Sequence, residues 1–299
     1  MAFLNFLLYY FFIIPISLLP FPVMYGLSNV LYYLFYYVIG YRKEVVLQNL
    51  RNSFPEKTAA EREEIARKFY RHFCDLLLES LKAFTISDKE VRKRMVIRNT
   101  DILDHYYEQK RSVIIATGHY NNWELFVLAL AAPLKHKAIA IYKPLTNAFF
   151  DNKMKEMRTK YGLKMISTKF VKRVFEEEKN NLTATTFGFD QAPAYAEKSH
   201  WMTFLNQDTG IMIGAERFAK FYDYPVVYCH VRKDKRGHYS FWFSEACDQP
   251  KKTANGEITE KITRMLEAEI INEPEYYLWT HKRWKYGRPA KVRSFQKLS

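Results

Sequence analysis

The first 41 residues contain no Lys, Arg, Asp or Glu and are rich in Phe, Tyr, Leu and Ile. A soluble domain seldom has so long an uncharged aromatic stretch. The stretch also lacks the basic n-region and small-residue cleavage site of a secretory signal. Pro15, Pro20 and Pro22 interrupt it, which leaves a second apolar piece, Val23 to Ile39, at the lower length limit for crossing a bilayer. The pattern fits either one span or a re-entrant hairpin.

The tyrosines of this stretch favour a shallow position in a membrane. Their rings are apolar and their hydroxyls polar, a combination that suits the bilayer interface better than its centre. Arg42, Lys43 and Arg51 follow directly, and the positive-inside rule then predicts that the rest of the chain faces the cytoplasm. We therefore expect residues 1–41 to be a membrane anchor and residues 42–299 to form a cytoplasmic-facing domain. The alternative is a buried helical hairpin inside a soluble protein.

The charge balance predicts an anionic partner. The chain has 46 Lys+Arg against 32 Asp+Glu, a formal net charge of +14. Nucleic acid, anionic lipid head groups and an acidic carrier protein all fit that sign. Cys74, Cys229 and Cys247 are widely spaced without a C-x-x-C pattern, which predicts neither a disulfide framework nor a zinc site. There is no Gly-rich phosphate loop either, so we expect no metal and no cofactor.

After the uncharged stretch, short apolar segments alternate with helical patterns. The expected buried strands are 112–118, 137–142, 163–167, 182–190 and 225–231. The expected helices are 61–84, 122–133, 147–161, 169–179, 210–222 and 257–274. This alternation predicts an α/β fold with a mixed, mostly parallel sheet flanked by helices, following an N-terminal helical segment. Residues 237–246 are expected to add a strand at the sheet edge.

His119 and Glu124 lie in "SVIIATGHYNNWELF", a pattern typical of a strand, a glycine turn and a helix. His119 is therefore expected at the carboxyl end of a strand, where open α/β sheets bind their ligands. Five positions along an ideal helix correspond to about 500°, which leaves two side chains roughly 140° apart. The pair can meet only if His119 lies in the turn, which Gly118 permits. Glu124 would then reach back to the imidazole, select its tautomer and stabilise imidazolium.

A His–carboxylate pair without a serine or cysteine nucleophile suits direct group transfer. The base takes a proton from an acceptor hydroxyl as that oxygen attacks an activated acyl group, and no covalent enzyme intermediate is required. Because H-x₄-E alone is a weak pattern, the alternative is a turn histidine with a glutamate near a helix start.

Several blocks follow one another along nearly the whole chain: the uncharged N-terminus, "VVLQNLRNSFPE", "TGHYNNWELF", "YKPLTNAFFDNKMKEMRTKYG", "DQAP" and "YYLWTHKRWKYGRP". Their order resembles the lipid A late acyltransferase family, which shares a His-x₄-acid motif with the glycerolipid acyltransferases. The resemblance implies a glycerolipid-acyltransferase-like fold, a catalytic dyad of His119 and Glu124, and acyl carrier protein as the thioester donor. The acceptor it implies is a hydroxyl of a lipid A precursor, and the implied location is the bacterial inner membrane, with the catalytic domain on the cytoplasmic side.

Five further residues are candidates for substrate binding or oxyanion contact: Arg158, Lys143, Asp190, Gln191 and Asn122. The resemblance implies cations beside the active site in the block that begins with "YKP", so Arg158 is expected to contact a phosphate or an oxyanion. Lys143 supplies a point charge where relatives often have arginine. The alternative for Arg158 is a charge on a solvated helix face. Asp190 and Gln191 end a strand and are expected on the same sheet rim as His119, where they would position the acceptor or organise nearby cations.

His281 lies in "WTHKRWKYGRP", where aromatic and cationic residues alternate. This segment fits binding of anionic head groups or an acidic carrier, and equally fits packing at a membrane interface. Two other functions stay open: the same reaction on a glycerolipid, amino-acid lipid or hydroxylated pigment lipid, and a non-enzymatic basic membrane protein that binds RNA or anionic lipid. The latter does not explain a glycine and a histidine after a buried strand, and the chain has no RNA-binding aromatic signature. We therefore expect a membrane and an anionic lipid acceptor as partners, and no nucleic acid.

Overall fold

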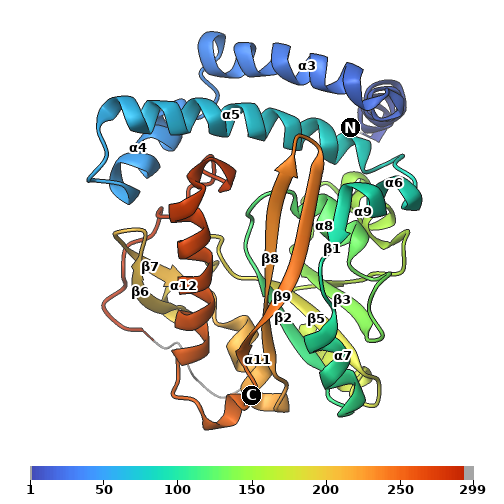
Figure 1. Cartoon of the computed structure of the whole chain (residues 1–299), viewed down its shortest axis with the longest axis vertical. Helices are drawn as coiled ribbons and strands as arrows, with labels where there is room; N and C mark the ends of the chain where they lie inside the picture. The colour runs from blue at the N-terminus through green and yellow to red at the C-terminus, as the bar shows by residue number, and fades with distance from the viewer. Residues whose placement is uncertain (1, 293–299) are drawn as a thin grey trace.

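The computed structural model describes residues 2–292 and has a seven-stranded sheet at its centre (Figure 1). The strands are β1 Met95–Ile97, β2 Val113–Thr117, β3 Lys137–Tyr142, β4 Lys164–Ser167, β5 Thr183–Gly188, β8 Val226–Lys235 and β9 His238–Cys247. Their order is β1-β9-β8-β2-β5-β3-β4, and β8–β9 is the one antiparallel pair of this sheet within the described residues. The predicted mixed, mostly parallel α/β fold is confirmed.

Helices cover both faces of the sheet. They are α4 Lys43–Ser53, α5 Ala59–Lys82, α6 Asp88–Arg94, α7 Asp101–Glu108, α8 Trp123–Ala129, α9 Ala148–Thr159, α10 Val171–Glu177, α11 Gly214–Tyr222 and α12 Glu257–Asn272. Successive residues of β2 point to opposite faces. Ile114 and Ala116 belong to a buried cluster that includes residues of α5, α11 and α12, whereas Val113 and Ile115 belong to a second cluster that includes residues of α6, α7 and α8. All five residues of β2 are buried, as expected for a central parallel strand covered on both sides.

The predicted strands occur as β2, β3, β4, β5 and β8, and the predicted helices as α5, α8, α9, α10, α11 and α12. The long helix α5 starts at a capping box that joins Thr58 and Glu61. The Thr58 hydroxyl accepts from the Glu61 backbone N at 3.2 Å, and the Glu61 carboxylate accepts from the Thr58 backbone N at 2.7 Å. These reciprocal bonds satisfy donors that the start of a helix leaves free.

Two predictions are wrong, one about the edge of the sheet and one about the start of a helix. Strand β9 is not at the edge, because the three-residue β1 pairs with its outer side in parallel. The helix expected from residue 210 begins at Gly214, since the residues before it belong to a hairpin of β6 His200–Phe204 and β7 Gln207–Ile211. Leu205 and Asn206 turn this hairpin with φ of 49° and 60°. A strand of three residues and a turn without glycine are too short and too unmarked for a sequence pattern to reveal.

The uncharged N-terminal segment forms two helices with a sharp bend between them, and each is made of consecutive shorter elements. They are α1 Ala2–Leu8, η1 Tyr9–Ile13, α2 Ile14–Leu18, α3 Phe21–Tyr33 and η2 Leu34–Val38. Among residues 2–292, no single helix has the length and apolar composition to cross a membrane. Phe3–Leu18 and Phe21–Val38 have them only as a pair, bent by 115°.

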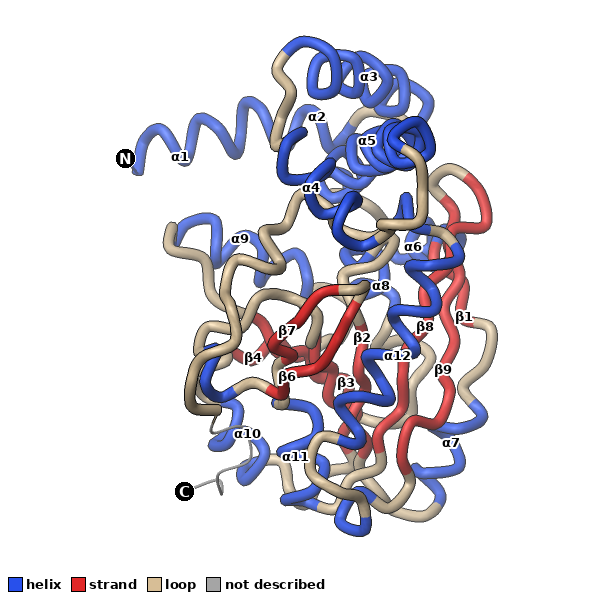
Figure 2. Tube along the Cα trace, turned by 90° about the vertical axis from the view of Figure 1, so that its left-hand side faces the viewer, coloured by secondary structure: helices blue, strands red, loops and turns tan. Residues whose placement is uncertain are grey.

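Helix α3 lies along α5 (Figures 1 and 2) and buries one of its sides there. Two acidic residues of α5 hold it: the Ser28 hydroxyl donates to Asp75 at 2.7 Å, and the Tyr25 hydroxyl donates to Glu79 at 2.8 Å. The outer sides of these helices are exposed, so the segment is not a hairpin buried within this chain. Its exposed large apolar residues are Phe3, Leu4, Phe6, Leu8, Tyr10, Phe11, Phe12, Leu18, Val23, Leu27, Val30, Tyr33, Leu34, Tyr37, Val38, Ile39 and Tyr41.

Candidate active site

His119 lies in the connection between β2 and α8, as predicted from the pattern of a strand, a glycine turn and a helix. Gly118 does not take a left-handed conformation, and it is needed for a different reason. A Cβ at this position would come within 2.8 Å of the methyl groups of Leu266, which is fully buried on α12. The left-handed residue is Asn121, with φ of 56°, and its side chain donates to the Val231 carbonyl at 2.8 Å. The turn is therefore shaped by close packing and by an asparagine.

The carboxylate of Asp190 is the partner of the His119 imidazole. Strands β2 and β5 are parallel neighbours, with Thr117 opposite Gly188. His119 and Asp190 each follow two residues later, so both emerge at the same rim, as predicted. Asp190 Oδ1 lies 2.7 Å from His119 Nδ1, and Oδ2 accepts from the His119 backbone N at 2.9 Å. This arrangement holds the tautomer with hydrogen on Nδ1 and leaves the lone pair on Nε2.

Nε2 of His119 has no hydrogen-bond partner among residues 2–292, and 26% of the side chain is exposed. Burial disfavours the charged imidazole, but the Asp190 carboxylate and its hydrogen bond outweigh burial, and Glu124 adds a further negative charge. The pKa of His119 is therefore raised. Burial of Asp190 acts in the opposite direction to its contacts with His119, and the pKa of Asp190 is lowered on balance. The site thus holds an ionised Asp190 beside an imidazole whose outer nitrogen is open.

Glu124 does not hydrogen-bond to His119, contrary to the contact expected from the sequence. Its carboxylate instead receives two hydrogen bonds from Arg158, Nε to Oε2 at 2.9 Å and Nη2 to Oε1 at 2.5 Å. Because α8 begins only at Trp123, Glu124 lies in its first turn and faces α9, which carries Arg158. Glu124 therefore acts on His119 through its charge, while Asp190 supplies the direct contact.

Arg158 belongs to the site and is not a charge on a solvated helix face. Its side chain is 20% exposed, and its fork-shaped guanidinium matches the Glu124 carboxylate, which is 7% exposed. Burial opposes the charge of Arg158, but Glu124 outweighs it and raises the pKa further. The pair places a permanent cation within electrostatic range of His119.

Asn122 anchors the start of α8. Its Oδ1 accepts from the Leu125 backbone N at 2.9 Å, and its Nδ2 donates to Glu79 Oε2 at 2.6 Å. Tyr239 also donates to that oxygen at 2.8 Å. Asn122 is 1% exposed, so the structure places it under the site as a support and away from solvent.

Lys143 and Gln191 make no side-chain hydrogen bond or ion pair within residues 2–292. Lys143 is exposed just after β3, and Gln191 is half-buried directly after Asp190. Both side chains are free to meet a ligand, and neither is held in one orientation by the protein.

His281 and Arg283 approach the site from the C-terminal segment. His281 Nε2 accepts from the Ala192 backbone N at 3.0 Å, which fixes the loop that follows Asp190. Burial, only partly offset by Asp190, lowers the pKa of His281 to about 4. Arg283 is 3% exposed, donates to the Gly210 carbonyl at 2.8 Å, and its charge helps to lower the pKa of Asp190. Sequence analysis singled out His281 but missed Arg283, although it lies in the same aromatic and basic stretch.

This arrangement can perform general-base chemistry. Nε2 of His119 can accept a proton from a hydroxyl, and Asp190 can stabilise the imidazolium that forms. Arg158 supplies positive charge near the same histidine, where it can stabilise an oxyanion or hold an anionic group.

Known proteins match this chain over nearly its whole length. Residues 2–286 match the family model described as bacterial lipid A biosynthesis acyltransferase. The chain is 25% identical over 271 residues to the lipid A biosynthesis palmitoleoyltransferase of Escherichia coli (strain K12), covering 89% of this chain and 86% of that protein. It is 23% identical over 279 residues to the lipid A biosynthesis lauroyltransferase of the same organism, covering 92% and 89%. A match over nearly the whole length shows that the chain belongs to the bacterial lipid A biosynthesis acyltransferase family.

Proposed function

We propose that this acyltransferase moves a fatty acyl chain from an acyl carrier protein thioester to a hydroxyl of a lipid A precursor. The observation that carries the proposal is the open Nε2 of His119, opposite an Nδ1 that Asp190 holds at 2.7 Å. The names of the relatives support the acceptor class. The formal net charge of +14 suits both an acidic carrier and an anionic acceptor.

The proposed reaction proceeds in two proton-coupled steps. Nε2 of His119 takes the proton of the acceptor hydroxyl as the oxygen attacks the thioester carbonyl carbon and forms a tetrahedral oxyanion. The oxyanion then collapses, the C–S bond breaks, and the carrier thiolate leaves with the proton from the imidazolium. The products are an ester and a free carrier thiol, and the enzyme returns to its starting state.

Glu124 keeps a catalytic role in this proposal, through its charge and through Arg158. Its carboxylate raises the pKa of His119 from a distance and orients the Arg158 guanidinium. The guanidinium then stabilises the oxyanion or binds a phosphate of the acceptor. Lys143 and Gln191, whose side chains have no partner in the described chain, would complete the contacts to the acceptor.

We also propose that residues 1–41 hold the enzyme at the bacterial inner membrane, with residues 42–299 on the cytoplasmic side. The support is the exposed aromatic and aliphatic surface of α1 to η2. Arg42, Lys43 and Arg51 follow it at once, as expected for a segment next to anionic head groups. The bend of 115° between its two halves favours insertion into the interface.

The test is to incubate the enzyme with matched acyl-carrier-protein and acyl-coenzyme A donors, offering a lipid A precursor, a glycerolipid and an amino-acid lipid as acceptors. Mass spectrometry should find one added acyl chain on the lipid A precursor, drawn from the carrier protein. His119→Ala should lose about 10²- to 10⁴-fold in rate, whereas His105→Ala, exposed on α7, should keep it. Acylation of only a glycerolipid or amino-acid lipid would replace the proposed acceptor, and full activity of His119→Ala would refute the mechanism.

A further inference from the structure

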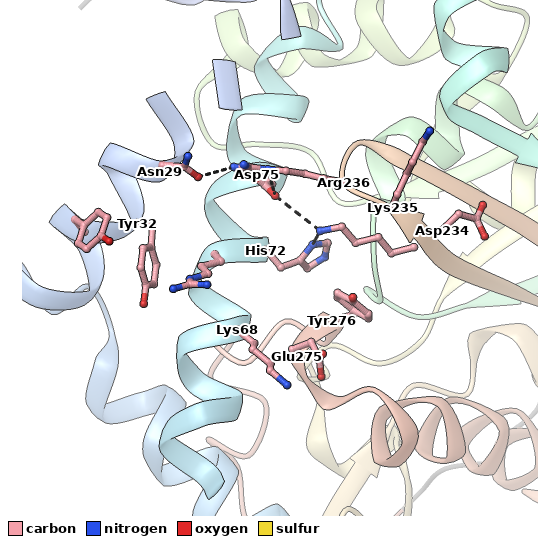
Figure 3. Close-up of a pocket in the computed structure, with 13 residues that line it drawn as sticks. Asn29, Tyr32, Lys68, His72, Asp75, Asp234, Lys235, Arg236, Glu275 and Tyr276 are labelled. Carbon is pink, nitrogen blue, oxygen red and sulfur yellow. Dashed lines mark hydrogen bonds and ion pairs between the residues drawn. The ribbon is translucent and has the colours of Figure 1, made fainter. Parts of the chain in front are cut away.

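A cavity of about 670 Å³ lies between α3, α5, the tip of the β8–β9 hairpin and the turn η5 Pro274–Tyr276 (Figure 3). We name it the α3–α5 pocket. His119, Glu124, Arg158 and Asp190 are not among its lining residues, so it is separate from the candidate active site. Neither the catalytic mechanism nor the family motifs account for it.

The α3–α5 pocket has an excess of positive charge. Five cationic side chains line it: Lys68, Arg71, Lys233, Lys235 and Arg236. Lys68, Arg71 and Lys235 are exposed and form no ion pair within residues 2–292. Arg71 lies over the ring of Tyr32, 5.1 Å from its centroid, and none of the three cations is neutralised by a carboxylate, so each can attract an anion that enters the cavity.

Two of the three carboxylates in the wall are already occupied. Arg236 binds Asp75 through Nε at 3.0 Å and through Nη2 at 2.6 Å. Arg98 binds Asp234 at 2.7 Å. Glu275 forms no ion pair within the described chain and remains an acceptor for hydroxyl groups. The unpaired charge of the cavity is therefore mainly positive and suits an anion, and Glu275 can accept hydrogen bonds from hydroxyl groups beside it.

A buried histidine also belongs to the wall of this cavity. His72 is 3% exposed and lines the α3–α5 pocket, where its ring packs on Tyr276 (Figure 3). The Lys233 ammonium lies 3.2 Å from His72 Nδ1 and can only donate, so Nδ1 accepts and the ring hydrogen is on Nε2. This Nε2 is itself buried and has no hydrogen-bond partner within residues 2–292. His72 therefore adds an unpaired donor beside Lys233 in the wall, and no negative charge that would oppose an anion in the cavity.

The rim of the pocket is continuous with an apolar surface. Tyr33 lines the cavity and is itself 60% exposed. On the same helical segment, Val30, Tyr37 and Val38 are also exposed. A ligand that placed an anionic group among the cations would have its hydrocarbon chains against this surface. Free phosphate would gain nothing from it.

We propose that the α3–α5 pocket binds the phosphate-bearing headgroup of an anionic phospholipid. The phosphate lies among Lys68, Arg71 and Lys235, the headgroup hydroxyls face Glu275, and the acyl chains leave past Tyr33 along the apolar side of α3. This site goes beyond the proposed acyl transfer, because it fixes the enzyme on anionic lipid without taking part in catalysis.

The test measures binding of dihexanoyl phosphatidylglycerol, below its micelle concentration, to the full chain in a neutral detergent by isothermal titration calorimetry. The test variant is Arg71→Gln/Lys235→Gln, in which both replaced side chains are exposed. The charge-matched control is Lys172→Gln/Lys179→Gln, on and just after α10, at the opposite end of the molecule from α3 (Figure 2). The test variant should bind at least about tenfold more weakly, since each replaced cation donates charge-assisted hydrogen bonds to the phosphate.

The control variant and His119→Ala should both bind like the wild type, which separates this site from the proposed catalytic function. Equal binding by the test variant and the wild type would overturn the proposal. An equal loss in the control variant would also overturn it, because diffuse charge would then explain the binding. Inorganic phosphate should bind far more weakly than the lipid, and equal affinity would overturn the assignment to a lipid headgroup.

Discussion

The Asp190 carboxylate hydrogen-bonds to His119 at two points, with Oδ1 2.7 Å from the imidazole Nδ1 and Oδ2 2.9 Å from the backbone N. One carboxylate therefore sets both the tautomer of the ring and the position of the turn that carries it. Only 3% of Asp190 is exposed, so water does not compete strongly for either bond. The arrangement makes the open nitrogen of His119 depend on a residue 71 positions away.

Asp190→Asn should lower kcat by about 10²- to 10⁴-fold and leave KM nearly unchanged. The amide can donate to Nδ1, which favours the tautomer with hydrogen on the wrong nitrogen, and it no longer stabilises imidazolium. Asp101→Asn, exposed on α7, is the matched control. Initial rates across donor concentrations would decide the matter, and a wild-type kcat for Asp190→Asn would remove Asp190 from the mechanism.

Breaking the Glu124–Arg158 pair should affect stability as well as rate. Arg158→Ala leaves a largely buried carboxylate unpaired, which should cost about 3 kcal/mol of unfolding free energy. Arg158→Ala/Glu124→Gln should recover much of that stability, because the buried charge is gone, yet should stay at least about tenfold slower than the wild type. Chemical denaturation and rates on the same preparations would show both effects. Recovery of rate together with stability would make the pair purely structural.

The acid limb of the pH–rate profile should report His119. The base must be neutral, and its pKa is raised above the ordinary value of about 6.5, so kcat/KM should rise with pH through a midpoint above that value. Asp190→Asn removes the main cause of the rise while burial remains, so the midpoint should move to lower pH. The same raised pKa means that this contact contributes stability below the unfolded pKa and loses it as pH rises through the folded pKa. An unchanged midpoint in Asp190→Asn would contradict the assignment.

Removing apolar side chains from the outside of the N-terminal segment should weaken membrane association without unfolding the protein. Phe11→Ser/Val38→Ser changes two residues that are 69% and 75% exposed, so little core packing is lost. The soluble fraction after high-salt washing should increase relative to the wild type. Phe170→Ser/Ile271→Ser, exposed elsewhere on the molecule, should fractionate as the wild type does. Identical behaviour of the two variants would argue against residues 1–41 as the membrane contact.

Elements whose pattern is local could be predicted from the sequence. The strand expected at residues 112–118 and the helix expected at 61–84 occur as Val113–Thr117 and Ala59–Lys82, because burial and helical spacing are visible in consecutive residues. The position of His119 in a turn was predicted from the buried strand and the glycine that precede it. The uncharged segment before Arg42 and the sequence blocks that resemble the acyltransferase family could also be recognised from the sequence. Neither depends on which strands become neighbours in the sheet.

Which side chains meet depends on long-range packing, which local patterns do not reveal. His119 and Asp190 meet because β2 and β5 are adjacent with Thr117 opposite Gly188, and no local pattern states that strand order or register. Glu124 turned toward Arg158 because α9 packs beside α8, a contact between residues 34 positions apart. Long-range pairing is selected by the combined burial of the whole sheet. For that reason the sequence predicted the rim on which His119 and Asp190 lie but not the partner of each side chain.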